Sequence, residues 1–286
     1  MTRMLCCLLA LLAISHAATA GEPTGTLKKV KDSGTIVLGY REASPPFSYL
    51  DDAGRPIGFS IDLCLAIVKE VKAELGVADL KVGFVPVEVE TRVSRLIAGD
   101  IDIECGSTTV TLSRQREVDF TLLTFVTGTE LLLKADSNIV SVEDLKDQRV
   151  AVIPGTTTER VIADILAKAA VAAAIVEVKD HDEGLAAVEG GTADAYASDG
   201  VILIGLAKGS KDPAALKITN STLSYEPYGL MVRRDDSAFR LVANRALNRL
   251  YRSGEIFGVF RRWFGPWQAR PSELLKALYA VQSVPD

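Results

Sequence analysis

The sequence has few of the residues that build metal centres and disulfide scaffolds. Its 286 residues include 4 cysteines and 2 histidines. Two of the cysteines and one histidine fall within the first twenty residues, which leaves Cys64, Cys105 and His181 for the rest of the chain. One histidine and two separated cysteines do not make a zinc site, so we expect no bound metal.

Several functional motifs are also missing. The net charge is −5 and no run of five basic residues occurs, so a nucleic-acid partner is not expected. The sequence has no G-x-S-x-G, G-x-G-x-x-G or C-x-x-C, and we expect no cofactor. No stretch after residue 20 approaches the roughly 18 apolar residues of a membrane span. The whole sequence is 48% hydrophobic and 24% charged, a composition typical of a globular, soluble protein.

The first twenty residues have the pattern of a secretory signal peptide. Arg3 precedes an apolar stretch over residues 4–14, and small residues around Ala20 suit cleavage before Gly21. The apolar stretch is too short to span a bilayer. We therefore expect an exported protein, cleaved near Ala20. Cleavage removes one positive charge, Arg3, so the net charge changes from −5 to −6.

The remaining chain alternates short apolar strands with helices in two successive units, which predicts an α/β fold with mostly parallel sheets. Ser60 and Thr91 are predicted helix N-caps, and glycines mark several helix ends. The predicted strands are residues 35–40, 82–87, 101–105, 130–134, 149–153, 175–178, 193–198 and 229–232. The predicted helices are residues 60–75, 91–99, 157–170, 182–189, 199–208 and 237–252.

Polar residues follow five of these strands, where ligands bind in open α/β sheets. These strand-end segments are residues 41–44, 106–109, 154–157, 179–181 and 198–200. At the third, the glycine and threonines at 155–158 begin a helix whose free N–H groups would attract an anion, although they also suit an ordinary capped helix start. Asp199 would suit an ammonium ligand and equally an N-cap.

The charged residues and cysteines allow alternative roles. Arg41, Arg92 and Arg114 follow strand ends and could bind the carboxylates of acidic small molecules. The alternating acidic residues at positions 100, 102 and 104 could ligate a metal, but a solvated strand face is the favoured interpretation. Cys64 and Cys105 are most simply buried small hydrophobic residues, with a bridge between them as the alternative.

These segments together resemble the bacterial periplasmic amino-acid-binding proteins of ABC importers (solute-binding protein family 3), and within them the glutamate/aspartate receptors. The resemblance is carried by residues 41–49 (REASPPFSY) and 104–109 (ECGSTT) with Arg114, and continues through residues 155–157, residues 179–181 and Asp199. It covers nearly the whole chain after residue 20, in order. The resemblance implies a type II periplasmic-binding-protein-like fold, with two α/β lobes joined by two crossing strands near residues 124–129 and 224–228.

The resemblance also implies lobe boundaries and a ligand. Lobe one would comprise residues 21–127 plus 226–286, and lobe two residues 128–225. The ligand would be L-glutamate or L-aspartate, delivered by a monomeric receptor to membrane permease subunits. Roles follow for eight residues: Arg114, Thr109 and Thr157 on the α-carboxylate, Asp199 and Ser107 on the α-ammonium, and Arg41, Arg92 and His181 on the side-chain carboxylate. A neutral amino acid would leave Arg41 and Arg92 without a carboxylate in a desolvated cleft, which is costly.

One position departs from the subgroup. Receptors of this kind tend to have a serine where this chain has Val89, and the missing hydroxyl would cost about 1 kcal/mol of binding. This leaves the ranking of glutamate and aspartate open. If Val89 faces the ligand, strand alternation would turn Glu88 and Glu90 away from it.

Two other functions remain as alternatives at this point. Periplasmic dehydratases of prephenate-like acids resemble these receptors, and fold alone does not separate enzyme from receptor. Asp199 together with Arg41 and Arg92 suits an amino acid with a second carboxylate and so favours the receptor. The sensor domain of a membrane receptor is less favoured, since we expect no transmembrane or signalling segment.

Overall fold

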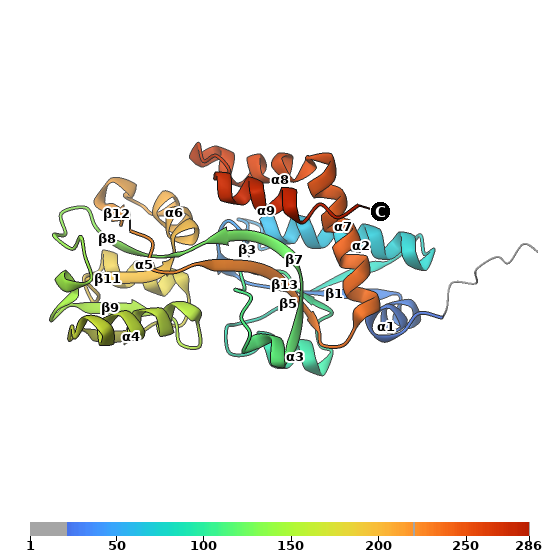
Figure 1. Cartoon of the computed structure of the whole chain (residues 1–286), viewed down its shortest axis with the longest axis horizontal. Helices are drawn as coiled ribbons and strands as arrows, with labels where there is room; N and C mark the ends of the chain where they lie inside the picture. Colours follow the sequence, from blue (N-terminus) through green and yellow to red (C-terminus); the bar gives the residue numbers. More distant parts are fainter. Residues whose placement is uncertain (1–21, 220, 286) are drawn as a thin grey trace, which may run out of the picture.

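The computed structural model describes residues 22–219 and 221–285, so the predicted signal peptide lies outside the described residues. Two five-stranded sheets form the cores of two lobes, which lie side by side along the long axis of the molecule (Figure 1). The long strands β7 (Val118–Thr127) and β13 (Glu226–Arg233) run from the first lobe toward the second. The fold is therefore of the two-lobe α/β type that the sequence predicts.

The first lobe is built on a sheet with the strand order β5-β1-β6-β13-β7. β1 is parallel to β5 and β6, whereas β13 is antiparallel to β6 and β7. Its other strands are β1 (Thr35–Tyr40), β5 (Lys81–Pro86) and β6 (Ile103–Glu104), and a small separate sheet contains β2 (Ala43–Ser44), β3 (Ser48–Leu50) and β4 (Pro56–Ile57). The helical elements before β7 are α1 (Gly25–Ser33), α2 (Phe59–Leu75), α3 (Arg92–Ala98) and η1 (Arg114–Arg116), and those after β13 are α7 (Ser237–Ser253), α8 (Glu255–Phe264), η4 (Gly265–Trp267) and α9 (Glu273–Val281).

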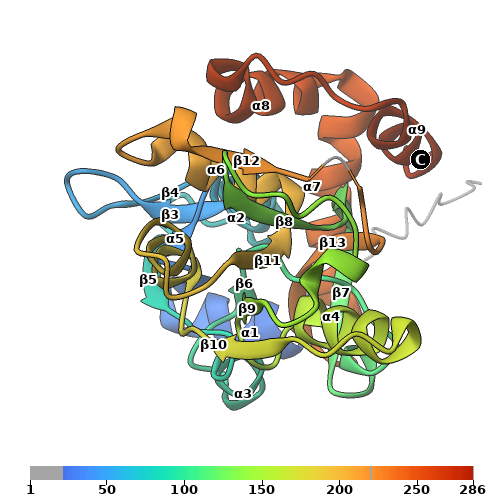
Figure 2. The ribbon, with the colours of Figure 1, turned by 90° about the vertical axis from the view of Figure 1, so that its left-hand side faces the viewer.

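The second lobe has a sheet with the order β10-β9-β11-β8-β12, which Figure 2 shows with β12 at the top and β10 at the bottom. β9 is parallel to β10 and β11, whereas β8 is antiparallel to β11 and β12. The strands are β8 (Thr129–Lys134), β9 (Arg149–Val152), β10 (Ala174–Glu177), β11 (Ala195–Asp199) and β12 (Leu216–Ile218). The helical elements are η2 (Glu143–Leu145), α4 (Thr157–Ala169), α5 (His181–Glu189), α6 (Gly200–Gly209) and η3 (Pro213–Ala215). Both lobes thus repeat the same mixed arrangement.

Local sequence signals explain the helix starts beside the strand ends. The Thr156 hydroxyl accepts a hydrogen bond from the N–H of Glu159, and the Glu159 carboxylate accepts one from the N–H of Gly155, so both ends of this turn are satisfied. Asp180 caps α5 in the same way, by accepting from the N–H of Glu183. These caps fix the segments that follow β9 and β10.

Several sequence predictions differ from the structure. The sheets are mixed rather than mostly parallel, because β8 and β13 enter them from the connections between the lobes and run against their neighbours. Ser60 is not the N-cap of α2, which begins at Phe59; its hydroxyl instead donates to the carbonyl of Gly106. The predicted strands and helices do not include α1, α8, α9, β7, β12 or the small sheet of β2, β3 and β4. Among residues 22–219 and 221–285, none of the helices has the length and hydrophobicity that a membrane span requires.

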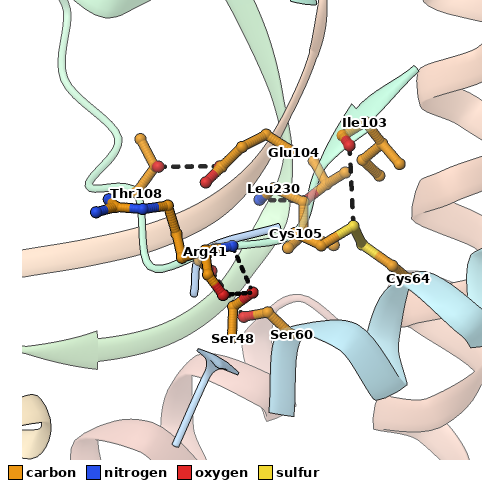
Figure 3. Close-up of a disulfide and its surroundings, with 11 residues drawn as sticks. Arg41, Ser48, Ser60, Cys64, Ile103, Glu104, Cys105, Thr108 and Leu230 are labelled. Carbon is orange, nitrogen blue, oxygen red and sulfur yellow. Dashed lines mark hydrogen bonds between the residues drawn. A yellow bond between two sulfur atoms is a disulfide. The ribbon is translucent and has the colours of Figure 1, made fainter. Parts of the chain in front are cut away.

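Cys64 and Cys105 form a disulfide, so the favoured expectation of two free buried thiols is wrong (Figure 3). Cys64 lies on the buried face of α2 and Cys105 directly follows β6, with their Cα atoms 6.2 Å apart. The disulfide links α2 covalently to the end of β6, just before the segment that begins at Gly106. The hydrogen bond from Ser60 to Gly106 joins the same two elements.

Reduction of this disulfide is expected to lower the free energy of unfolding by about 2–4 kcal/mol, because the bridge links residues 41 positions apart and restricts the unfolded chain. Urea unfolding with and without a thiol reductant measures the loss. The C64A/C105A variant is the control, since its stability should not respond to reductant. Identical midpoints for the wild-type protein in both conditions would contradict the prediction.

The acidic residues before Cys105 do not form a solvated strand face. Asp102 is fully buried, and its carboxylate binds Lys29 at 2.9 Å and Arg233 at 2.8 Å. Glu104 is also fully buried, whereas Asp100 is exposed. The favoured expectation is therefore wrong for two of the three, because cations from distant parts of the chain meet this strand. The metal alternative gains no support either, since the described part of the chain has no group of three or more potential ligands.

Candidate functional site

One cavity is lined by residues of both lobes, at the ends of their strands. All eight residues singled out in the sequence line it. The first lobe contributes Arg41, Arg92, Ser107, Thr109 and Arg114, and the second contributes Thr157, His181 and Asp199. Ligands of open α/β sheets bind at this position, beyond the carboxyl ends of the strands. The fold thus brings together segments that are spread over about 160 positions of sequence.

The cavity has further lining residues that sequence reasoning did not select. Most of them neighbour a selected residue on the first turn of α4, on β11 or at the start of α6, so alternation along β11 could have indicated part of the set. These residues are Ile153, Thr156, Thr158, Tyr196, Ala197, Ser198 and Ile202.

Arg92 is the first residue of α3 and only 5% exposed. Its Nη1 donates to the Thr108 hydroxyl at 2.8 Å, and that hydroxyl donates to the carboxylate of Glu104 at 2.9 Å (the second bond is drawn in Figure 3). Burial lowers the pKa of Arg92 to about 9, with a further lowering from Arg114 and an opposing contribution from Glu104. Arg92 therefore stays charged at neutral pH, and the Thr108 hydroxyl links it to the buried carboxylate of Glu104.

Glu104 compensates part of the positive charge that the three arginines bring into the cavity. Burial raises the pKa of its carboxyl group, while Arg92, the Thr108 hydroxyl and the other two arginines act in the opposite direction. One of its oxygens, Oε1, is buried and has no hydrogen-bond partner among the described residues. Sequence reasoning missed this role because Glu104 was assigned to a solvated face.

Arg41 follows β1 and is only 3% exposed. The Ser48 hydroxyl accepts from its backbone N–H at 2.9 Å, and its Nη2 lies 3.2 Å from Oε2 of Glu88. As expected from a Val89 that lines the cavity, Glu88 and Glu90 do not line it and are exposed, but the carboxylate of Glu88 still reaches Arg41. The reason is local: β5 ends at Pro86, so strand alternation does not apply to these residues.

Arg114 connects the two lobes. Its Nη1 donates to the carbonyl of Thr109 at 2.8 Å, and its Nη2 donates to the carbonyl of Gly155 at 3.5 Å. The hydroxyls of Thr109 and Thr157 lie 3.3 Å apart across the same gap. Burial, and next the charge of Arg160, lower the pKa of Arg114. The guanidinium, two hydroxyls and the N-terminus of α4 together form a binding site suited to a carboxylate.

Asp199 ends β11 and is 8% exposed. Its Oδ2 accepts from the Tyr228 hydroxyl at 2.5 Å, and its Oδ1 is buried with no partner among the described residues. Burial, followed by the nearby Glu226, raises the pKa of Asp199 to about 7. Asp199 is the N-cap residue of α6, as the alternative has it, but its carboxylate makes no cap hydrogen bond to that helix. Oδ1 is available to a cationic ligand group.

His181 begins α5, and its Nδ1 lies 2.6 Å from the Tyr196 hydroxyl. Burial, together with the charges of Arg41 and Arg92, lowers the pKa of His181 to about 3. The imidazole is therefore neutral at physiological pH. It can contribute a hydrogen bond to a ligand carboxylate but not a positive charge.

Comparison with known proteins agrees with this geometry. The sequence matches the model of the bacterial extracellular solute-binding proteins, family 3, over residues 36–266. It is 42% identical to an L-glutamate/L-aspartate-binding protein of Pseudomonas aeruginosa over 252 residues, which are 88% of this chain and 83% of that protein. It is 36% identical to a glutamate/aspartate import solute-binding protein of Escherichia coli K12, with the same coverage of each chain.

Solved structures give the same result for the fold. An ancestral amino-acid-binding protein described as a precursor of cyclohexadienyl dehydratase superposes with a TM-score of 0.74 at 31% identity, over 84% of this chain and all of that one. An ancestral arginine-binding protein bound to glutamine superposes with a TM-score of 0.72 at 31% identity, over 81% of this chain and 98% of that one.

These matches support a binding protein and give no support to the dehydratase alternative. The match to the family covers both lobes and every residue that lines the cavity. The chain belongs to the bacterial extracellular solute-binding proteins of family 3, and it is a two-lobe solute-binding protein and not an enzyme.

Proposed function

We propose that this protein is a periplasmic receptor that binds L-glutamate or L-aspartate between its lobes and delivers it to the membrane permease of an ABC importer. The observation that carries the proposal is the charge of the cavity: three buried or half-buried arginines and one aspartate face it. A dicarboxylic amino acid has the matching pattern of two negative groups and one positive group. The names of the two glutamate/aspartate-binding relatives support the same ligand class.

Each ligand group has a proposed set of partners. The α-carboxylate would bind Arg114, Thr109 and the first turn of α4 at Thr157. The α-ammonium would bind Asp199 and Ser107, since Oδ1 of Asp199 is buried and unpaired among the described residues. The side-chain carboxylate would bind Arg41, Arg92 and the neutral His181.

The proposed lobes are residues 21–127 plus 226–286 and residues 128–225, with the connections between β7 and β8 and before β13 as the hinge. A ligand that contacts both lobes would stabilise the closed arrangement by a population shift. The contact of Arg114 with Gly155 and that of Thr109 with Thr157 are compatible with this arrangement, because each joins residues of the two lobes. The permease would then bind the surface of the closed form. We further propose a monomer with its signal peptide cleaved near Ala20 and no nucleic-acid partner.

Isothermal titration of the refolded protein tests the proposal, because refolding strips any ligand that copurifies. Glutamate, aspartate, glutamine and histidine serve as ligands. Tight binding of glutamate or aspartate, and much weaker binding of the other two, is the expected result. The ratio of the two acids' affinities then gives their ranking, which the sequence leaves open. No binding of either acid would refute the proposal.

A further inference from the structure

Glu88 stands out as a carboxylate that contacts one of the cavity's arginines, Arg41, without lining the cavity. Its Oε2 lies 3.2 Å from Nη2 of Arg41, and its side chain is 48% exposed whereas that of Arg41 is 3% exposed. The guanidinium of Arg41 thus points into the cavity on one side and binds a protein carboxylate on the other.

The backbone holds Glu88 in this position. Its N–H donates to the Thr91 hydroxyl at 3.0 Å, and its carbonyl accepts from the N–H of Arg92 at 2.9 Å. Glu88 is therefore fixed at the start of α3, on the same segment as Val89 and Arg92. Its carboxylate lies close to the place that the proposed function gives to the ligand's side-chain carboxylate.

Glu88 and an acidic ligand would use the same cation. Glu88 is paired with the guanidinium at Nη2, and Nε of Arg41 is buried with no hydrogen-bond partner among the described residues. A second carboxylate that approaches Arg41 meets a partly compensated charge, and it is repelled by Glu88 at short range. A neutral side chain such as that of glutamine experiences no such repulsion.

We propose that Glu88 is a specificity-setting residue that competes with the ligand's side-chain carboxylate for Arg41 and so reduces the preference for acidic over neutral amino acids. The inference rests on the proposed function, since it requires that an acidic side chain lie beside Arg41. Glu88 acts through Arg41 and does not touch the ligand. It also keeps Arg41 paired when the ligand leaves, which favours release.

The E88Q variant tests this inference. Its amide oxygen can still accept from Arg41, but its negative charge is gone. We expect glutamate and aspartate to bind about two- to fivefold more tightly than to the wild-type protein, the range for a partly exposed ion pair, and glutamine to bind within about 1.5-fold of the wild-type affinity. Titration of each ligand at about 0.15 M salt, near physiological ionic strength, measures the change. A merely structural role for Glu88 would not produce tighter binding of acids alone.

The matched control is E90Q. It also removes one negative charge, but from Glu90, an exposed residue two positions after Glu88. Its affinity for all three ligands should equal that of the wild-type protein. E88A is the second test variant and keeps the inference testable if E88Q does not fold. It should also bind the two acids more tightly than the wild-type protein does, with little change for glutamine. Unchanged or weaker binding of acids to E88Q and E88A, an equal gain for glutamine, or the same gain in E90Q would overturn the inference. Failure of the wild-type protein to bind either acid would instead refute the proposed function.

Discussion

Replacement of Arg92 by alanine is expected to weaken glutamate binding about 30- to 3,000-fold and glutamine binding by less than about tenfold. Loss of one partner of a buried charge pair costs about 2–5 kcal/mol of binding, and each 1.4 kcal/mol is a factor of ten. Arg92 fits that case, because it is 5% exposed and lines the cavity. Glutamine offers it a neutral oxygen, whose hydrogen bond contributes less.

Titration of R92A with glutamate and with glutamine measures the two losses, and their ratio is the decisive quantity. R92A also removes the positive charge that acts most strongly on the buried Glu104, so a loss of stability by itself would not test the role in specificity. R95A is the matched control, since it removes an arginine from the same helix outside the cavity lining. Equal losses for glutamate and glutamine would refute the assignment of Arg92 to the side-chain carboxylate.

The sequence predicts those parts of the fold whose signals are local. β1 is a short apolar run, and α4 begins at a glycine and three threonines whose hydrogen bonds can be anticipated from the sequence. The segments that follow five of the predicted strands are polar, and this polarity alone points to the strand ends where the cavity lies. The roles within the cavity come from the resemblance to a family, since spacing alone does not show that Arg41, Arg92 and Arg114 converge.

The features that could not be predicted depend on contacts between distant positions. Asp102 is buried because Arg233, 131 positions away, reaches its carboxylate. The partner of Cys105 is decided by the approach of α2 to the segment that follows β6, and no local signal gives this. The direction of β13 depends on how the chain returns from the second lobe.

The direction of the Glu88 side chain is another feature of the candidate site that the sequence does not predict. Alternation predicts its direction only if residues 88–91 continue β5, but Pro86 is the last residue of that strand. A turn at this point rotates the carboxylate toward Arg41. Where the strand ends thus decides whether alternation can predict the direction of the Glu88 side chain.

Glutamate affinity is expected to fall about tenfold between pH 8 and pH 6, because Asp199 must be ionised to bind the ligand's ammonium group. Its raised pKa of about 7 means that the carboxyl group is mostly protonated at pH 6 and mostly ionised at pH 8. Ligand binding favours the ionised form and so releases a proton, which is why affinity rises with pH and levels off above the pKa. His181, with a pKa of about 3, stays neutral throughout this range and contributes nothing to the slope.

Titration in two buffers of different ionisation enthalpy measures the released proton directly. In D199N the dependence on pH should disappear, and affinity at pH 8 should fall about 30-fold or more because the ammonium group loses a buried charged partner. Y228F provides a third comparison. The Tyr228 hydroxyl lowers the pKa of Asp199, so its removal should shift the fall in affinity to higher pH. The same affinity for glutamate at pH 6 and pH 8, with no proton released, would show that Asp199 is not the group that binds the ammonium.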